Sequence, residues 1–141
     1  GQKIWQMLKG ASHGWDEPRT PLKYYVQNTV VVKRGKNQDF MNIQRRLKQM
    51  MSETEYTGNR AVFRLNSGGN NQTFMVINGF DSHATSFTNN LPEETNFADA
   101  YNEKFGENAW SEDWTAASEA IETWGSSVVK MMYRADLSSK L

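Results

Sequence analysis

Three segments that have the composition of β-strands are apolar at successive positions rather than at alternate ones. They contain Val30-Val31-Val32, Phe74-Met75-Val76-Ile77 and Met131-Met132-Tyr133. Successive side chains of a strand point to opposite faces of a sheet, so a sheet with one solvated face should alternate apolar and polar residues. Both faces of this sheet are therefore expected to be buried. Few other segments could cover the second face, which favours a homodimer in which two sheets meet.

The rest of the pattern predicts an α+β domain over residues 23–141, preceded by an N-terminal arm over residues 1–22 in which Ile4, Trp5 and Leu8 could form one helical turn. Strands are expected over residues 24–33, 61–66, 72–80 and 127–137. Apolar residues recur at helical spacing in two regions. These are Phe40, Ile43, Leu47, Met50 and Met51, and later Phe97, Tyr101, Phe105, Trp110, Trp114, Ala117, Ile121 and Trp124. The order predicts a ferredoxin-like βαββαβ fold with a four-stranded antiparallel sheet and an enlarged second helical crossover.

Composition excludes several classes of protein. The chain has 141 residues, no cysteine, and equal numbers of basic and acidic side chains, 16 of each. This length suits one domain, and the absence of cysteine excludes a disulfide scaffold or a thiolate metal site. Residues 1–60 carry eleven basic and five acidic side chains, whereas residues 81–125 carry one basic and ten acidic. This asymmetry could orient a partner, although an ordinary separation of solvated helices explains it better. No apolar run approaches the ~20 residues of a membrane-spanning helix.

The first strand and the glycine that follows it, residues 27–35 (QNTVVVKRG), resemble the dimeric α/β-barrel superfamily. This superfamily includes antibiotic-biosynthesis-type monooxygenases, haem-degrading monooxygenases, and small stress-response or NIPSNAP-like proteins. The resemblance covers roughly residues 24–137 and is one of pattern. It implies two ferredoxin-like subunits joined sheet to sheet, each with a mostly apolar pocket between its sheet and its helices.

The resemblance also implies a role for Asn28, which matches an asparagine that helps to position haem-bound oxygen in the haem-degrading branch. That branch has a tryptophan near the end of the third strand and a histidine ligand on the later helix. Here the third strand ends in Asn78-Gly79-Phe80, and the later helix offers Tyr101 and Phe105. No haem or other cofactor is therefore expected.

Aromatic residues of the second helical region are the candidate ligand contacts. Tyr101, Phe105, Trp110, Trp114 and Trp124 could form the wall of a pocket for a flat apolar ligand. The alternative is that these rings fill the core above the sheet. His83, which would titrate near neutral pH, is a candidate acid or base beside Asn28.

Other chemistries have little support in the sequence. The two histidines, His13 and His83, have no metal-ligand spacing, and no nucleophile elbow is present. The cluster of Arg45, Arg46 and Lys48 is modest and lacks the aromatic motif of RNA-recognition strands. No metal, nucleic acid or membrane partner is expected. The sequence thus predicts a small-molecule-binding or stress-response-like protein. The alternative is a cofactor-independent monooxygenase that acts on a flat apolar substrate. A pure interaction module is a third possibility.

Overall fold

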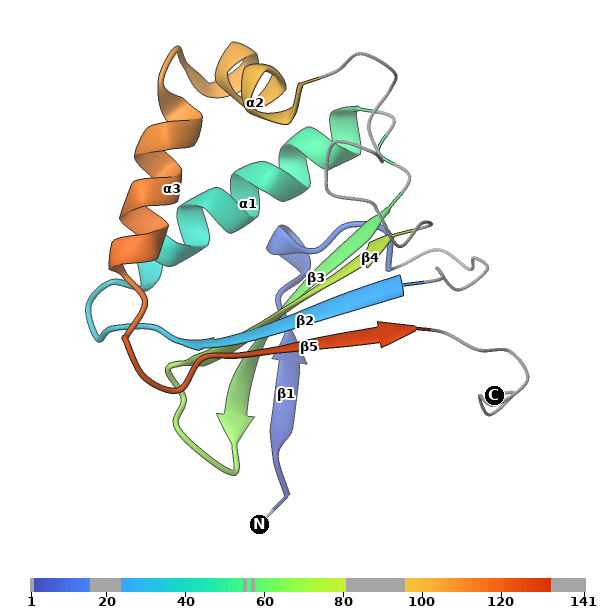
Figure 1. The fold of residues 1–141 in the computed structure, drawn as a ribbon. Helices are drawn as coiled ribbons and strands as arrows, with labels where there is room; N and C mark the ends of the chain where they lie inside the picture. The colour runs from blue at the N-terminus through green and yellow to red at the C-terminus, as the bar shows by residue number, and fades with distance from the viewer. Residues whose placement is uncertain (1, 16–23, 55, 57, 81–95, 133–141) are drawn as a thin grey trace.

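The structure is a computed structural model of the whole chain, and it describes residues 2–15, 24–54, 56, 58–80 and 96–132. Within these residues one antiparallel sheet has the strand order β1-β3-β4-β2-β5. The strands are β1 (Ile4–Met7), β2 (Tyr24–Val31), β3 (Asn59–Ser67), β4 (Thr73–Phe80) and β5 (Ser127–Met132). The helices are α1 (Asn37–Glu53), α2 (Phe97–Phe105) and α3 (Ala109–Glu119), with a 3-10 turn η1 at Lys9–Ala11. All three α-helices lie on one side of the sheet (Figure 1).

The predicted four-stranded ferredoxin-like sheet is wrong, because the described sheet has five strands. Residues 4–7, where a helical turn was expected, form β1 and pair with β3. The pairing places Trp5 opposite Leu65 and Met7 opposite Phe63. An open edge of β3 would expose a row of unpaired backbone groups, and β1 satisfies them. The dimeric α/β barrel that was inferred from a four-stranded subunit is overturned with it.

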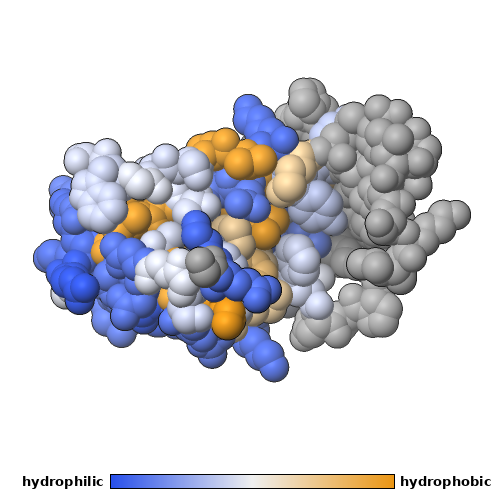
Figure 2. All heavy atoms as spheres, turned by 90° about the horizontal axis from the view of Figure 1, so that it is seen from below, coloured by the Kyte–Doolittle hydropathy of each residue, from blue (hydrophilic) through white to orange (hydrophobic). Residues whose placement is uncertain are grey.

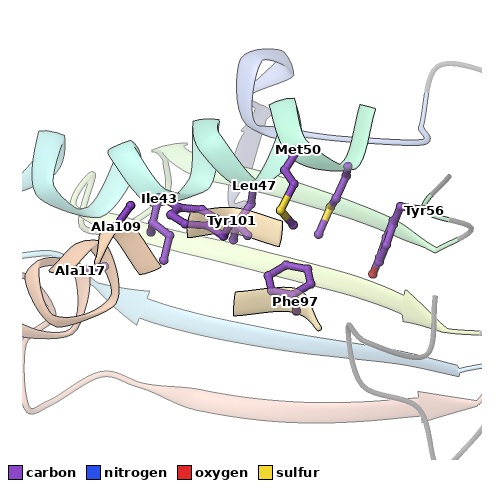
Figure 3. Close-up of a cluster of buried hydrophobic side chains, with 9 residues drawn as sticks. Ile43, Leu47, Met50, Tyr56, Phe97, Tyr101, Ala109 and Ala117 are labelled. Atoms are coloured by element: carbon purple, nitrogen blue, oxygen red, sulfur yellow. The ribbon is translucent and has the colours of Figure 1, made fainter. Parts of the chain in front are cut away.

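Helix α1 contributes to two apolar clusters. Its first turns, at Phe40 and Met41, contact Val62 of β3 and Phe74 of β4. The ring centroids of Phe40 and Phe74 are 5.0 Å apart in an edge-to-face arrangement. Farther along the helix, a second cluster joins α1 to α2 and α3 (Figure 3); it contains Ile43, Leu47, Met50, Met51, Tyr56, Phe97, Tyr101, Ala109 and Ala117. The predicted helical stripe of α1 is thus confirmed as buried core.

The predicted helical crossover consists of two helices, α2 and α3. Gly106, at φ 131°, separates them. Helix α3 ends at Glu119, so Trp124 lies beyond it in the turn that leads to β5. That turn is tied to the end of β2, because Glu122 N donates to the Val31 carbonyl at 2.8 Å and Lys33 N donates to the Ala120 carbonyl at 2.8 Å.

The sheet face opposite the helices also carries apolar side chains. The strand register puts Val62 and Val76 on the helix side, and residues one position away therefore point outward. The outward residues that are half-buried or exposed include Trp5, Tyr25, Phe63, Met75, Ile77, Val129 and Met131. Figure 2, seen from below the sheet, shows orange apolar atoms there among blue and pale ones.

Candidate functional site

Tyr101, the first of the expected ligand contacts, is a core residue. Its ring is fully buried in the cluster between α1, α2 and α3. Its hydroxyl donates to Asp113 Oδ2 at 2.5 Å, and Arg46 Nη1 donates to the same oxygen at 2.8 Å. Burial, followed by the hydrogen bond to Asp113, raises the pKa of Tyr101 above its ordinary value. These contacts join the three helices through one polar link, and they leave Tyr101 no surface for a ligand.

The other expected aromatic contacts are spread over different environments. Phe105 is half-buried, with the Arg46 guanidinium 4.9 Å from its ring centroid. Trp110 packs on Phe97 and Tyr101, and Trp114 stacks on Trp110 with ring centroids 5.5 Å apart. Trp114 is 54% exposed and Trp124 is 55% exposed. The structure thus brings Tyr101, Phe105, Trp110 and Trp114 together, and it places Trp124 outside the helices.

Of the two expected catalytic residues, Asn28 lies in the described part of the chain and His83 does not. Asn28 lies on β2, opposite Val76 of β4 and Val128 of β5, on the helix side of the sheet. Its side chain is half-buried, and Val128 beside it is 61% exposed, so this part of the helix side is open to solvent. His83 lies outside the described residues.

A cavity of about 570 Å³ lies at the other end of the sheet, between the N-terminal segment and the start of α1. The chain reaches it from β1 and η1, from the first turns of α1, and from one position each on β3 and β4. The lining residues are Gln6, Met7, Leu8, Lys9, Gly10, Ala11, Asn37, Gln38, Met41, Arg45, Arg64 and Phe74. We call this space the α1 cavity.

The floor of the α1 cavity is apolar. Met7 and Leu8 are half-buried and Met41 is 9% exposed, whereas Phe74 and Ala11, each 1% exposed, are enclosed in the core. Leu8 and Met41 belong to or pack against the same core cluster as Phe74. A ligand on this floor would therefore contact Leu8 and Met41, which the packed core holds in position without it.

The rim of the α1 cavity is basic. Lys9 on η1, Arg45 on α1 and Arg64 on β3 line it, and none of the described residues that line it is acidic. Arg45 Nη2 donates to the amide oxygen of Gln38 at 2.6 Å. Arg64 Nε donates to the Asn71 carbonyl at 2.8 Å, and Arg64 Nη2 donates to the amide oxygen of Gln72 at 3.0 Å. Both guanidinium groups are therefore held by neutral oxygens.

Gln72 organises this rim from a buried position. Its side chain is 7% exposed, and its Nε2 donates to the Val32 carbonyl at 3.1 Å and to Asn37 Oδ1 at 2.6 Å. The same amide accepts the hydrogen bond from Arg64. Gln72 therefore couples the end of β2, the start of α1 and the rim arginine on β3.

A second, smaller cavity of about 340 Å³ adjoins the α1 cavity. It is lined by Arg34, Gly35, Asn37, Gln38 and Gln72. Asn37 and Gln38 line both cavities. The basic and amide-rich surface thus continues past the start of α1.

A buried cation, unlike those of the rim, lies between β3 and α1. Arg60 of β3 is buried, and its Nη2 donates to the amide oxygen of Gln44 at 2.6 Å. Burial lowers the pKa of the Arg60 guanidinium to about 10, so the group keeps its charge at neutral pH.

The sequence analysis identified Arg45 only as part of a basic cluster and missed Lys9, Arg64, Gln72 and the floor residues as members of one site. These positions lie on η1, α1, β3, β4 and the segments that connect them, and no local spacing marks them. Within the part of the chain that is described, no group of three or more histidine, aspartate or glutamate side chains could hold a metal ion. None of the helices in that part is both long and apolar enough to cross a bilayer.

Comparison of the chain with protein-family models, with curated proteins and with solved structures gave no match.

Proposed function

We propose that this protein binds a small organic molecule in the α1 cavity. The observation that carries the proposal is the combination of a fixed apolar floor with polar groups that converge from β1, η1, α1 and β3. Ligand sites in proteins typically have this composition, with mostly apolar contact and a few polar groups that set orientation. The volume of about 570 Å³ falls in the range of about 300–1,000 Å³ that is usual for such sites.

This location differs from the expected apolar pocket along the aromatic helices. It still lies between the sheet and a helix, but the helix is α1 and the apolar contacts are Leu8 and Met41. We therefore retain the small-molecule-binding function that the sequence predicted, and we propose the α1 cavity as its site in place of the aromatic helices.

A variant that fills the floor tests the proposal. Met41→Trp should add bulk at the base of the α1 cavity, whereas Met75→Trp makes the same change on the outward face of β4. Ligand-observed NMR of a library of small organic molecules should give hits with the wild-type protein and with Met75→Trp. The same hits should lose at least about tenfold in affinity with Met41→Trp, because displaced contacts with the floor are worth more than about 1.4 kcal/mol.

Circular dichroism first establishes that both variants are folded. Hits that bind Met41→Trp as they bind the wild-type protein would contradict the proposed site, and a library without any hit would contradict the function.

Two further expectations from the sequence, a monooxygenase activity and a homodimer, stay predictions. The cofactor-independent monooxygenase would act through Asn28 and His83, and His83 lies outside the described residues. The homodimer would form through the outward face of the sheet. The apolar residues of that face, such as Met75, Ile77 and Val129, support the homodimer.

A further inference from the structure

We infer that the ligand of the α1 cavity is an organic anion, a carboxylate or a phosphate ester with an apolar body. This inference rests on the proposed function and adds the chemical class of the ligand. Its charged group would lie among Arg45, Arg64 and Lys9, and its apolar body would lie on Leu8 and Met41.

The first support is charge. Among the residues that the structure describes, three cationic side chains line the α1 cavity and no carboxylate does. Like charges that converge on a cavity with an apolar floor create a positive potential, because the low-dielectric wall focuses the field. An anion is the ligand that such a potential attracts.

The second support is the nature of the existing partners. In the part of the chain described, no carboxylate lies within ion-pair distance of Lys9, Arg45 or Arg64. The neighbouring Arg46 on α1 behaves differently, because its Nη1 is 2.8 Å from Asp113 Oδ2. Two successive arginines on one helix thus have different environments. Arg46 is neutralised at the α3 interface, whereas Arg45 lines the α1 cavity and has no ion-pair partner within the described part of the chain.

The third support is preorganisation. Arg64 is held by the Asn71 carbonyl and the Gln72 amide, and its Cζ lies 5.2 Å from the Phe74 ring centroid. Its Nη1 has no hydrogen-bond partner among the described residues. A guanidinium fixed in this way can donate to a carboxylate or phosphate oxygen with little loss of side-chain entropy.

The fourth support is the floor, which excludes a bare inorganic anion as the best ligand. Leu8 and Met41 offer apolar contact in the same cavity as the cationic rim. An ion such as phosphate would use the rim alone, whereas an anion with an aromatic or aliphatic body would use both. The adjoining cavity at Arg34 and Gln38 leaves room for a further polar group on the same ligand.

Calorimetric titration with three matched probes tests the inference. The probes are 2-naphthoate, 2-naphthyl phosphate and the neutral 2-naphthamide, which share one ring system. We expect the wild-type protein to bind one or both anions at least about tenfold more tightly than the amide, since charge-assisted hydrogen bonds to arginine provide that difference. The tighter of the two anions identifies the ligand as a carboxylate or a phosphate ester.

Three variants assign the effect to the rim. Arg64→Met and Arg45→Met should each weaken anion binding at least about fivefold and leave 2-naphthamide binding unchanged. Lys48→Met, which removes the same charge from α1 outside the lining of the cavity, should change anion binding less than about twofold. Arg45 is exposed, so Arg45→Met should fold. That variant therefore still tests the inference if Arg64→Met does not fold.

Equal affinity of the wild-type protein for 2-naphthamide and both anions would overturn the inference and leave the proposed function standing. Failure of all three probes to bind the wild-type protein would also overturn it, and the library screen described above then decides separately whether the α1 cavity binds other molecules.

Discussion

The guanidinium of Arg64 lies over the ring of Phe74, with Arg64 Cζ 5.2 Å from the ring centroid. A cation in this position is attracted by the negative face of the ring, and the ring is itself fixed by an edge-to-face contact with Phe40. The apolar core therefore positions a charged group of the α1 cavity. The orientation of Arg64 then depends on core packing and on the buried amide of Gln72.

Replacement of Gln72 should lower the free energy of unfolding and loosen the position of Arg64 at the rim of the α1 cavity. Gln72→Leu removes the hydrogen bonds to the Val32 carbonyl, to Asn37 and to Arg64. Because the Val32 carbonyl would lose a partner near the core, we expect a loss of about 1–3 kcal/mol in the free energy of unfolding. Urea denaturation measures it. Gln38→Leu, at an exposed rim position, is the control and should cost less than about 0.5 kcal/mol. Equal costs for the two variants would show that Gln72 does not organise this region.

Strand β1 depends on a glycine in the β3–β4 turn. Gly68 has φ +90°, and an added Cβ would lie 2.4 Å from the Gln2 carbonyl oxygen and 2.7 Å from Lys3 Cα. Gly68→Ala should therefore destabilise the protein by more than about 1 kcal/mol and weaken the pairing of β1 with β3. Hydrogen exchange at the Leu8 amide, which donates to the Val62 carbonyl of β3 at 2.8 Å, measures the second effect.

Gly10 provides the matched control for that substitution. An added Cβ there meets no heavy atom within 4 Å. Gly10→Ala should leave stability within about 0.5 kcal/mol of the wild-type value. If Gly68→Ala is tolerated as well as Gly10→Ala, the close approach of the turn to residues 2–3 is wrong.

The hydrogen bond from Tyr101 to Asp113, which helps to link the three helices, should make the free energy of unfolding fall at alkaline pH. The pKa of Tyr101 is raised in the folded state, so the folded protein keeps the phenolic proton at a pH where the unfolded chain has lost it. This contribution is fully present below the ordinary tyrosine pKa of about 10, and it is lost as the pH rises above that value. Chemical denaturation at pH 8 to 11 should show the decline.

Tyr101→Phe isolates this contribution. The variant loses the hydrogen bond to Asp113 and should be less stable by about 1.5–3 kcal/mol at neutral pH. Its stability should also decline less steeply than that of the wild-type protein above about pH 10. Identical pH profiles for the two proteins would show that Tyr101 does not contribute to the alkaline decline.

The outward face of the sheet predicts self-association. A sheet face with exposed Val129 and Met131 and half-buried Met75 and Ile77 favours burial against a second copy of the chain. Native mass spectrometry should show a species of twice 16.2 kDa, and Ile77→Lys should reduce it to the monomer. Asn66→Lys, on the exposed end of β3, is the control. A wild-type monomer at every concentration measured would contradict the dimer.

Local patterns predicted much of the chain, because they report short-range structure. The stripe from Phe40 to Met51 predicted the buried side of α1, and the strand-like segments at residues 61–66 and 72–80 predicted β3 and β4. These signals arise within one element or between sequence neighbours.

Strand β1 could not be predicted in the same way. Its four residues are too few to show a period, and its partner β3 lies about sixty positions away in the sequence. The pairing is decided by the open edge of β3 rather than by any preference of residues 4–7. The missing strand is what made the expected sheet wrong.

The α1 cavity was missed for a related reason. Lys9, Arg64 and Phe74 come from separate elements, and their meeting depends on the position of β1 and η1. The sequence shows that Arg45 and Arg46 are adjacent, but not that Arg46 pairs with Asp113 while Arg45 reaches a cavity. Only the tertiary contacts distinguish the two side chains.

The most direct test of the central claim is a titration of the ¹⁵N-labelled protein with 2-naphthoate, followed by amide chemical shifts. The account predicts that the largest shift changes fall on residues 8–11, 37–45, 64 and 74, around the α1 cavity. Changes centred on Trp110 and Trp114 would contradict it and would return the site to the aromatic helices.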